Sequence, residues 1–141
     1  MQLVLDASVA IKWFLRGGEN EESDTERALE ILLRVQDGDV TLIQPPHFLA
    51  EMAAVLARIK PAECLEDFRN LQEISQDVCI DAGLYRRALR LSVSTGQHLF
   101  DTLYHAVALV TPGSLFITSD ARYFKGAFSH DRMRLLSELK F

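Results

Sequence analysis

Short apolar segments alternate with helical segments along almost the whole chain. The apolar segments are too short for helices, and they cover residues 2–6, 40–43, 78–80 and 115–118. Between them, apolar residues recur at helical spacing, which predicts helices at residues 7–15, 24–36, 47–59, 62–74, 82–94 and 98–110, and a short one after residue 120. Strands that alternate with helices join into a parallel sheet covered on both faces. Residues 134–141 fit either a last edge strand or a helical turn, so we expect an α/β fold with a mostly parallel sheet of four or five strands.

The composition indicates one compact domain over residues 1–141. Hydrophobic residues make up 48% of the chain, enough for a proper core, and neither a linker nor an internal repeat divides it. Cys64 and Cys79 have neither the paired spacing of a zinc site nor the density of a disulfide scaffold, which favours a reduced, cytoplasmic setting. The first residues lack the pattern of a signal peptide, and no apolar run approaches the roughly twenty residues that span a bilayer. We expect no membrane association.

The net charge of −5 bears on nucleic-acid binding. A basic surface is the usual mark of phosphate binding, so an acidic chain at first argues against it. Divalent ions at an acidic site would offset most of this charge and would themselves attract phosphate. The acidic segment at residues 19–26 is most simply a solvated face. Net charge therefore does not decide between nucleic acid and other ligands.

Four carboxylates stand where the predicted elements meet. Asp6 and Asp120 each follow an apolar strand, and the carboxyl ends of parallel strands open at one edge of a sheet, where ligands bind. Glu51 lies at the boundary of the apolar face of its helix, and Asp101 lies in the first turn of another helix. Each has an ordinary alternative: helix capping, interaction with the helix dipole or exposure to solvent. Their joint placement favours a shared site.

A cluster of four carboxylates points to a divalent metal ion. Unpaired carboxylates would repel one another and take up protons, so the cluster stays ionised only around a cation. Ligand sets made of oxygen alone select Mg²⁺ or Mn²⁺, and such an ion activates water for attack on a phosphodiester. Asp120 is expected to act as a direct ligand, through water or at a second ion. Ser8 and Thr118 are expected to bind water or to orient the carboxylates.

Four segments around these carboxylates resemble the motifs of VapC-type toxins, which have a PIN domain. Residues Asp6 to Phe14 resemble the first motif. The other three follow in the family's order, as Pro46-His47-Phe48-Leu49-Ala50-Glu51, Phe100-Asp101-Thr102-Leu103-Tyr104-His105-Ala106-Val107-Ala108-Leu109 and Ile117-Thr118-Ser119-Asp120-Ala121-Arg122-Tyr123-Phe124. Thr102 stands where alanine is frequent and Ser119 at a variable position, and neither departure removes a carboxylate. Each motif is short, but together they cover essentially the whole chain.

This resemblance implies a three-layer α/β/α PIN fold. It also implies an Mg²⁺- or Mn²⁺-dependent endoribonuclease that acts as the toxin of a VapBC-type toxin–antitoxin system, with Asp6, Glu51, Asp101 and Asp120 as catalytic residues and metal ligands. The partners it implies are an RNA substrate, a cognate antitoxin that blocks the site, and a second copy of the chain in a homodimer. The sequence of the cleaved RNA does not follow from the residues.

Basic residues near these motifs are candidates for contact with RNA phosphates. Lys12 and Arg16 share one helix face, and Arg58 lies two turns beyond the site glutamate. Arg122 and Lys125 follow the last aspartate. For all of them the alternative is a solvated helix face, and Arg58 also fits contact with the antitoxin.

Other interpretations of the same residues remain open. A catalytically silent PIN-like module would bind RNA or protein without cleaving it, and the presence of all four carboxylates weighs against this. A phosphoacceptor receiver would need adjacent acids near the first strand and a late lysine, and a phosphatase would need an aspartate where this chain has Ser8. Zinc held by His98, Asp101 and His105 would leave the other carboxylates without a role.

Aromatic residues near the motifs also have two interpretations. Trp13 and Phe14 lie in an apolar helical stretch and are expected in the core rather than as a platform for stacked bases. Tyr104 and the helix face that carries Phe48 fit a dimer interface as well as a core position.

Overall fold

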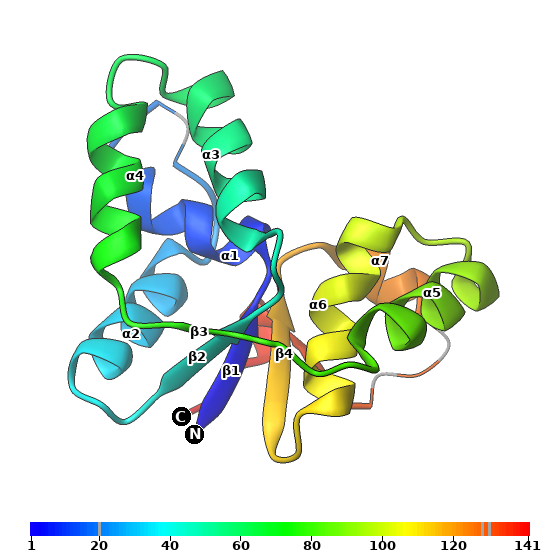
Figure 1. The fold of residues 1–141 in the computed structure, drawn as a ribbon. Helices are drawn as coiled ribbons and strands as arrows, with labels where there is room; N and C mark the ends of the chain where they lie inside the picture. The colour runs from blue at the N-terminus through cyan, green and yellow to red at the C-terminus, as the bar shows by residue number, and fades with distance from the viewer. Residues whose placement is uncertain (20, 128, 130) are drawn as a thin grey trace.

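A five-stranded, all-parallel sheet forms the centre of the structure (Figure 1). The computed structural model describes residues 1–19, 21–127, 129 and 131–141. The strands are β1 (Gln2–Leu5), β2 (Thr41–Gln44), β3 (Asp77–Val78), β4 (Ser114–Thr118) and β5 (Met133–Leu135). They lie in the order β3-β2-β1-β4-β5, and every neighbouring pair is parallel. The chain thus fills one half of the sheet outward from β1 and then the other half, outward from β4.

Helices cover both faces of this sheet. They are α1 (Ala7–Ala10), α2 (Thr25–Gln36), α3 (Phe48–Ile59), α4 (Cys64–Glu73), α5 (Leu84–Thr95), α6 (Leu99–Val110) and α7 (Ala121–Gly126), with the 3-10 turns η1 (Ile11–Phe14) and η2 (Leu136–Glu138). Helix α6 contacts β1, β2 and β4, and α5 packs on α6. Figure 1 shows α1 and α2 on the other side, and α3 and α4 as a pair beyond the carboxyl ends of the strands. The predicted three-layer α/β/α fold with a parallel sheet is confirmed.

Most of the predicted elements are present, and three differ in detail. The helix predicted at residues 7–15 is one α-helical turn followed by the 3-10 turn η1. The strand predicted at residues 78–80 is shorter and begins earlier, and Ile80 is exposed instead of paired. The tail combines both alternatives, since Leu135 ends strand β5 and Leu136 begins η2. No helix in the described part of the chain is long and apolar enough to cross a membrane.

The central strands are apolar on both faces because helices cover both faces. Leu3, Val4 and Leu5 of β1 are fully buried, and Phe116 of β4 stacks on Tyr104 of α6. Each such side chain contributes about 1.5–3 kcal/mol to stability through burial. The rigid strands β1 and β4 therefore end at fixed positions, which sets where the residues that follow them lie.

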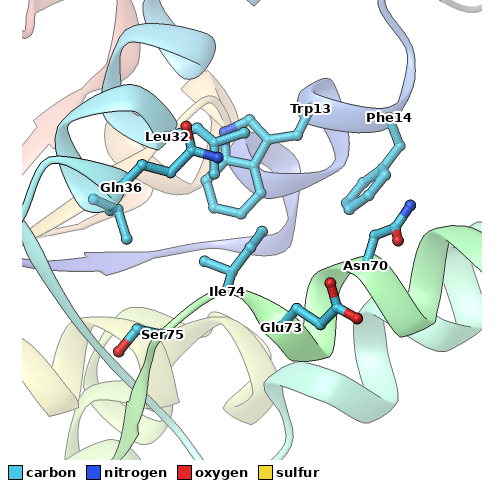
Figure 2. Close-up of a pocket in the computed structure, with 9 residues that line it drawn as sticks. Trp13, Phe14, Leu32, Gln36, Asn70, Glu73, Ile74 and Ser75 are labelled. Carbon is cyan, nitrogen blue, oxygen red and sulfur yellow. The ribbon is translucent and has the colours of Figure 1, made fainter.

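One hollow lies away from these strand ends, between η1, α2 and the end of α4 (Figure 2). It has a volume of about 510 Å³. Its lining, here called the Trp13 groove, comprises Trp13, Phe14, Leu32, Val35, Gln36, Asn70, Glu73, Ile74 and Ser75. Trp13 is buried and its indole Nε1 donates a hydrogen bond to the Ala28 carbonyl at 2.8 Å. Both Trp13 and Phe14 pack with the core, as predicted.

Candidate active site

Asp6 lies at the carboxyl end of β1 and is 8% exposed. Its Oδ1 accepts a hydrogen bond from the Ser8 backbone N–H at 2.6 Å, and its Oδ2 accepts one from the Thr118 hydroxyl at 2.7 Å. Burial raises the pKa of Asp6 to about 6, although the hydrogen bonds from Thr118 and Ser8 oppose the shift, and the charge of Glu51 adds to it. A carboxylate buried without a cation is therefore destabilising at neutral pH.

The ends of β1 and β4 are joined by short polar contacts. The Ser119 backbone N–H donates to Ser8 Oγ at 3.0 Å, and the Asp120 N–H donates to Thr118 Oγ1 at 2.9 Å. Asp120 itself caps α7, since its Oδ1 accepts from the Tyr123 N–H at 3.0 Å. Asp120 therefore caps α7, as one interpretation of the sequence predicted, and it also lies near the other acids. The Ser8 backbone and the Thr118 hydroxyl thus contact the Asp6 carboxylate, which is the placement that an orienting role requires.

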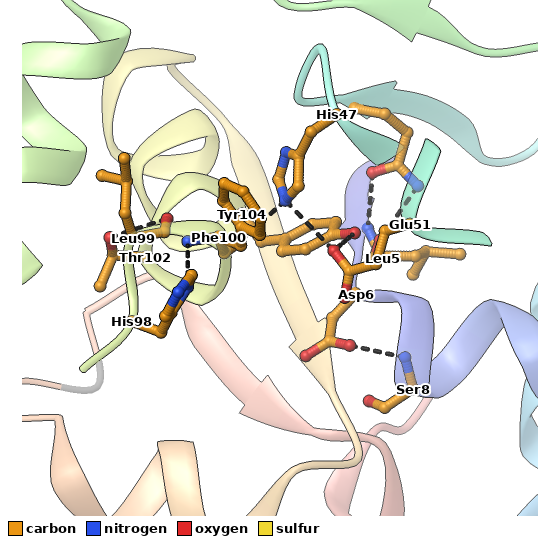
Figure 3. A network of polar contacts seen from close by, with 11 residues as sticks. Leu5, Asp6, Ser8, His47, Glu51, His98, Leu99, Phe100, Thr102 and Tyr104 are labelled. Carbon is orange, nitrogen blue, oxygen red and sulfur yellow. Dashed lines mark hydrogen bonds and ion pairs between the residues drawn. The ribbon is translucent and has the colours of Figure 1, made fainter. Parts of the chain in front are cut away.

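Glu51 lies in the first turn of α3 and is held by two side chains that sequence analysis did not assign to the site (Figure 3). The Tyr104 hydroxyl donates to Glu51 Oε2 at 2.8 Å, and His47 Nε2 lies 3.2 Å from the same oxygen. Burial, followed by the charges of Glu51 and Asp6, raises the pKa of Tyr104, so its hydroxyl keeps its proton. Both contacts fall on Oε2, which leaves Oε1 free of hydrogen bonds within the described residues.

Gln44 is a further residue that sequence analysis missed. Its Oε1 accepts from the Leu5 N–H at 3.1 Å and its Nε2 donates to the Leu5 carbonyl at 3.0 Å, with the whole side chain buried. The paired register of β1 with β2 ends before Leu5, so the Gln44 side chain satisfies backbone groups that a neighbouring strand would otherwise meet. This contact fixes the residue before Asp6 while the two strands separate. A glutamine in an apolar strand, just before Pro45, was the available signal.

Asp101 reaches the same region from the first turn of α6 and is partly buried. Burial raises its pKa, and the charges of Glu51 and Asp120 raise it further, while His98 and His47 oppose the shift. Glu51 and Asp120 therefore lie close enough to Asp101 for their charges to act on its carboxyl. The two helices and two strand ends thus bring four carboxylates to one place.

All four predicted carboxylates line one pocket of about 400 Å³, with Ser8 and Arg58 also in its wall. The pocket also includes Glu22, which the sequence suggested was part of a solvated face. Among the described residues, no three His, Cys, Asp or Glu side chains already stand in a ligating arrangement. The donors are oxygens, and the pKa values of Asp6 and Asp101 are raised first by burial and then by neighbouring negative charge, both of which a bound cation would offset. The residues present therefore fit Mg²⁺ or Mn²⁺.

The predicted basic residues take different positions around this pocket. Arg58 is in the pocket wall. Lys12 is 4% exposed, and its Nζ is 2.9 Å from Glu22 Oε1, so it lies on neither a solvated face nor the pocket wall. Arg16 is exposed and 3.5 Å from Glu26, and Arg122 is exposed outside the pocket lining. Lys125 is likewise exposed and outside the lining, so of the five candidates only Arg58 lines the pocket with the carboxylates.

Two alternatives from the sequence are not supported. His105, proposed as a zinc ligand, is 2% exposed, and its Nε2 lies 2.9 Å from the Asp131 carbonyl oxygen, whereas His98 is exposed. Tyr104 and Phe48, proposed for a dimer interface, are 0% and 2% exposed. The interface interpretation is wrong for both side chains, because they belong to the core.

Comparison with known proteins identifies the class of protein that this fold and site define. The sequence profile of the PIN domain matches residues 3–128, so the chain belongs to the PIN domain family. Among solved structures, the fold is similar to that of a chain in the crystal structure of VapBC2 from Rickettsia felis bound to a DNA fragment from their promoter. That match has a TM-score of 0.63 at 12% sequence identity and covers 96% of this chain and 98% of the other. A search of curated protein sequences finds no significant match.

Proposed function

We propose that this protein is an Mg²⁺- or Mn²⁺-dependent endoribonuclease that hydrolyses RNA phosphodiester bonds as the toxin of a VapBC-type toxin–antitoxin system. One observation carries the proposal: four carboxylates from four separate elements border one pocket at the carboxyl edge of the sheet. Membership of the PIN domain family supports it. The pocket lies at the carboxyl ends of the neighbouring strands β1 and β4, from which the chain continues toward opposite edges of the sheet. Parallel sheets bind ligands at such a point.

Each carboxylate has a distinct role in this proposal. Asp6, Glu51 and Asp101 would hold the metal ion, and Asp120 would bind it directly, through water or as part of a second site. When bound, the metal supplies an activated water and offsets negative charge on the phosphate. Thr118 and Ser8 fix both oxygens of Asp6. Tyr104 and His47 fix Glu51 through Oε2, which leaves Oε1 to ligate.

Arg58 supplies the positive side chain in the pocket wall. Its guanidinium is suited to bidentate contact with a phosphate oxygen pair, and we assign it to the backbone of the RNA. Lys12 is paired with Glu22, and Arg16 and Arg122 lie outside the pocket lining. These three would contact RNA only beyond the pocket.

The partners proposed are RNA, a cognate antitoxin that covers the pocket, and a second copy of the chain. The similarity to a chain of a VapBC2 structure supports the toxin–antitoxin assignment. Cys64 and Cys79 are both free, which suits action in the reducing cytoplasm. A PIN-like module that binds RNA or protein without cleaving it is the competing function.

An RNA cleavage assay distinguishes the two. Total RNA and single-stranded oligonucleotides would be incubated with the wild-type protein in Mg²⁺ or Mn²⁺ and, in parallel, in excess chelator. We expect metal-dependent cleavage by the wild type and its loss in Asp6→Asn and Asp101→Asn. Asp77→Asn, an exposed aspartate on β3, is the matched control and should cleave like the wild type.

Full cleavage in chelator, or undiminished cleavage by both site variants, would contradict the metal-dependent mechanism. Absence of cleavage by the wild type under every metal condition, with RNA binding retained, would favour the silent module instead.

A further inference from the structure

Phe100 is an exposed aromatic side chain that precedes Asp101 in the chain and contacts His47, which in turn contacts Glu51. It lies in the first turn of α6, where it is 54% exposed, although residues 102–108 of the same helix are buried. The next residue, Asp101, lines the pocket. Single exposed apolar residues are ordinary on protein surfaces, so exposure alone carries no argument. The surroundings of this ring are what distinguish it.

Two histidines frame Phe100 on both its ring and its backbone (Figure 3). The His98 ring meets the Phe100 ring edge to face, with centroids 4.8 Å apart, and the His47 ring is tilted against it at 5.3 Å. The Phe100 N–H donates to His98 Nδ1 at 3.1 Å, and its carbonyl accepts from His47 Nε2 at 2.9 Å. Little conformational freedom remains to be lost when a ligand meets such a ring.

His47 also connects this ring to the chemistry of the pocket. The same Nε2 that contacts the Phe100 carbonyl lies 3.2 Å from Glu51 Oε2. Both neighbours are acceptors, so Nε2 carries the hydrogen. The position of Phe100 is thereby tied to two candidate ligands, Glu51 through His47 and Asp101 through the chain itself.

The charges around the pocket limit how RNA can be held there. Arg58 is the cation among the described residues that line it, against five acids, namely Asp6, Glu22, Glu51, Asp101 and Asp120. Affinity for nucleic acid normally rests on many contacts between cations and phosphates, and this pocket supplies few. Stacking of a base on an aromatic ring contributes about 1–3 kcal/mol without needing positive charge.

We propose that Phe100 is a stacking platform for one unpaired base of the RNA, beside the bond that is cleaved. This inference rests on the proposed ribonuclease function and assigns Phe100 a contact with the substrate: the ring accepts a base that is free to leave its neighbours. A duplex keeps its bases stacked inside and presents none to the ring. Every base has a π-face, so the platform selects single strands rather than one base.

Binding of a fluorescent oligonucleotide tests this directly. The probe is a ten-nucleotide RNA with a central 2-aminopurine, whose fluorescence falls when it stacks, measured in chelator so that no cleavage occurs. The variants are Phe100→Leu, which keeps an apolar side chain without a π-face, and Phe100→Tyr, which restores the ring. Tyr85→Leu on α5 is the matched control, since Tyr85 is also 54% exposed.

We expect wild type and Phe100→Tyr to bind and quench the probe. Phe100→Leu should bind about tenfold more weakly without quenching, and its KM for cleavage in Mn²⁺ should rise more than its kcat changes. Tyr85→Leu should match the wild type. The same RNA annealed to its complement should bind all variants equally.

Wild-type affinity and quenching in Phe100→Leu would overturn the inference, as would equal losses in Tyr85→Leu or failure of the wild type to bind the single strand. A change from dimer to monomer in Phe100→Leu with RNA binding intact would mean that the ring covers a second copy, which also overturns it. If the wild type cleaves RNA while Phe100→Leu behaves identically, this inference fails and the proposed function stands. If the wild type cleaves nothing in any metal, the proposed function itself fails.

Discussion

The carboxylate pocket and the Trp13 groove are both open hollows, and they differ in what folding does to the groups that line them. The groove is the larger, at about 510 Å³ against about 400 Å³. Its buried polar group, the Trp13 indole N–H, is fully satisfied by the Ala28 carbonyl. In the pocket, the buried carboxyl of Asp6 has its pKa raised to about 6. Volume therefore does not distinguish the candidate site, whereas a buried carboxyl with a raised pKa does.

This contrast matches a general division of roles. Groups that only stabilise a fold tend to be satisfied within it, and groups kept in unfavourable environments tend to serve function. The groove should then govern stability and the pocket should govern activity. Substitutions in the groove should leave activity per folded molecule unchanged, and substitutions in the pocket should lower activity without a large loss of stability.

Trp13→Ala should have the largest effect on stability. Removing a buried indole costs about 3–5 kcal/mol in the free energy of unfolding, measured by denaturant titration. RNA cleavage per folded molecule should stay at the wild-type level at 10 °C. Loss of cleavage by fully folded Trp13→Ala would break the division between groove and pocket.

Glu51→Gln should show the opposite pattern. Replacing an ionised ligand by a neutral amide should lower cleavage about 100-fold or more, because the amide holds a divalent cation poorly, while the free energy of unfolding falls little. Glu73→Gln, in the wall of the groove, is the matched control. The contrast between hollows is refuted if both variants lose activity equally.

Asp6→Asn should make the metal-free protein more stable at neutral pH. A carboxyl whose pKa is higher in the folded state, about 6 against 3.8, contributes stability below pH 4 that is lost as the pH rises through 6. The shift corresponds to about 3 kcal/mol at most. Unfolding in chelator between pH 4 and pH 7.5 should therefore show a smaller decline for Asp6→Asn than for the wild type.

Asp77→Asn serves as the control for that series, since it removes an exposed aspartate of β3. An Asp6→Asn protein that is less stable than the wild type at pH 7.5 in chelator would show that the buried charge is not the source of the destabilisation.

Tyr104→Phe should have the smallest effect of the four. It removes one of the two contacts on Glu51 Oε2 and leaves His47 in place. Residues that orient ligands typically change metal affinity or activity by 10–100-fold, and with His47 retained we expect about tenfold weaker Mn²⁺ binding. Tyr123→Phe removes a buried hydroxyl near His105 instead and should bind Mn²⁺ normally. Equal Mn²⁺ affinity in both variants would remove Tyr104 from the account.

The sequence predicted the fold, and the placement of the four acids around one pocket, because both depend on local pattern. Asp6 and Asp120 follow apolar strands, and parallel strands open at one edge. Ser8 and Thr118 were accessible to the same reasoning, since each is two residues from an acid. These predictions required no knowledge of how distant side chains meet.

The supporting residues escaped prediction because their roles depend on tertiary neighbours. Tyr104 and Glu51 are 53 positions apart, and only the packing of α6 against α3 brings them into contact. Gln44 matters because β1 and β2 separate before Leu5, which no periodicity reveals. Lys12 was predicted to contact RNA, but the loop before α2 brings Glu22 to its amine.

Direct binding of Mn²⁺, measured by the electron paramagnetic resonance of the free ion at pH 7.5, tests the central claim that the carboxylates form a metal site. Saturable binding is predicted for the wild type and for Glu73→Gln, displaced by excess Mg²⁺ and lost in Asp6→Asn and Asp101→Asn. Wild-type protein that binds no Mn²⁺, or that binds it equally well without Asp6 and Asp101, would contradict the claim.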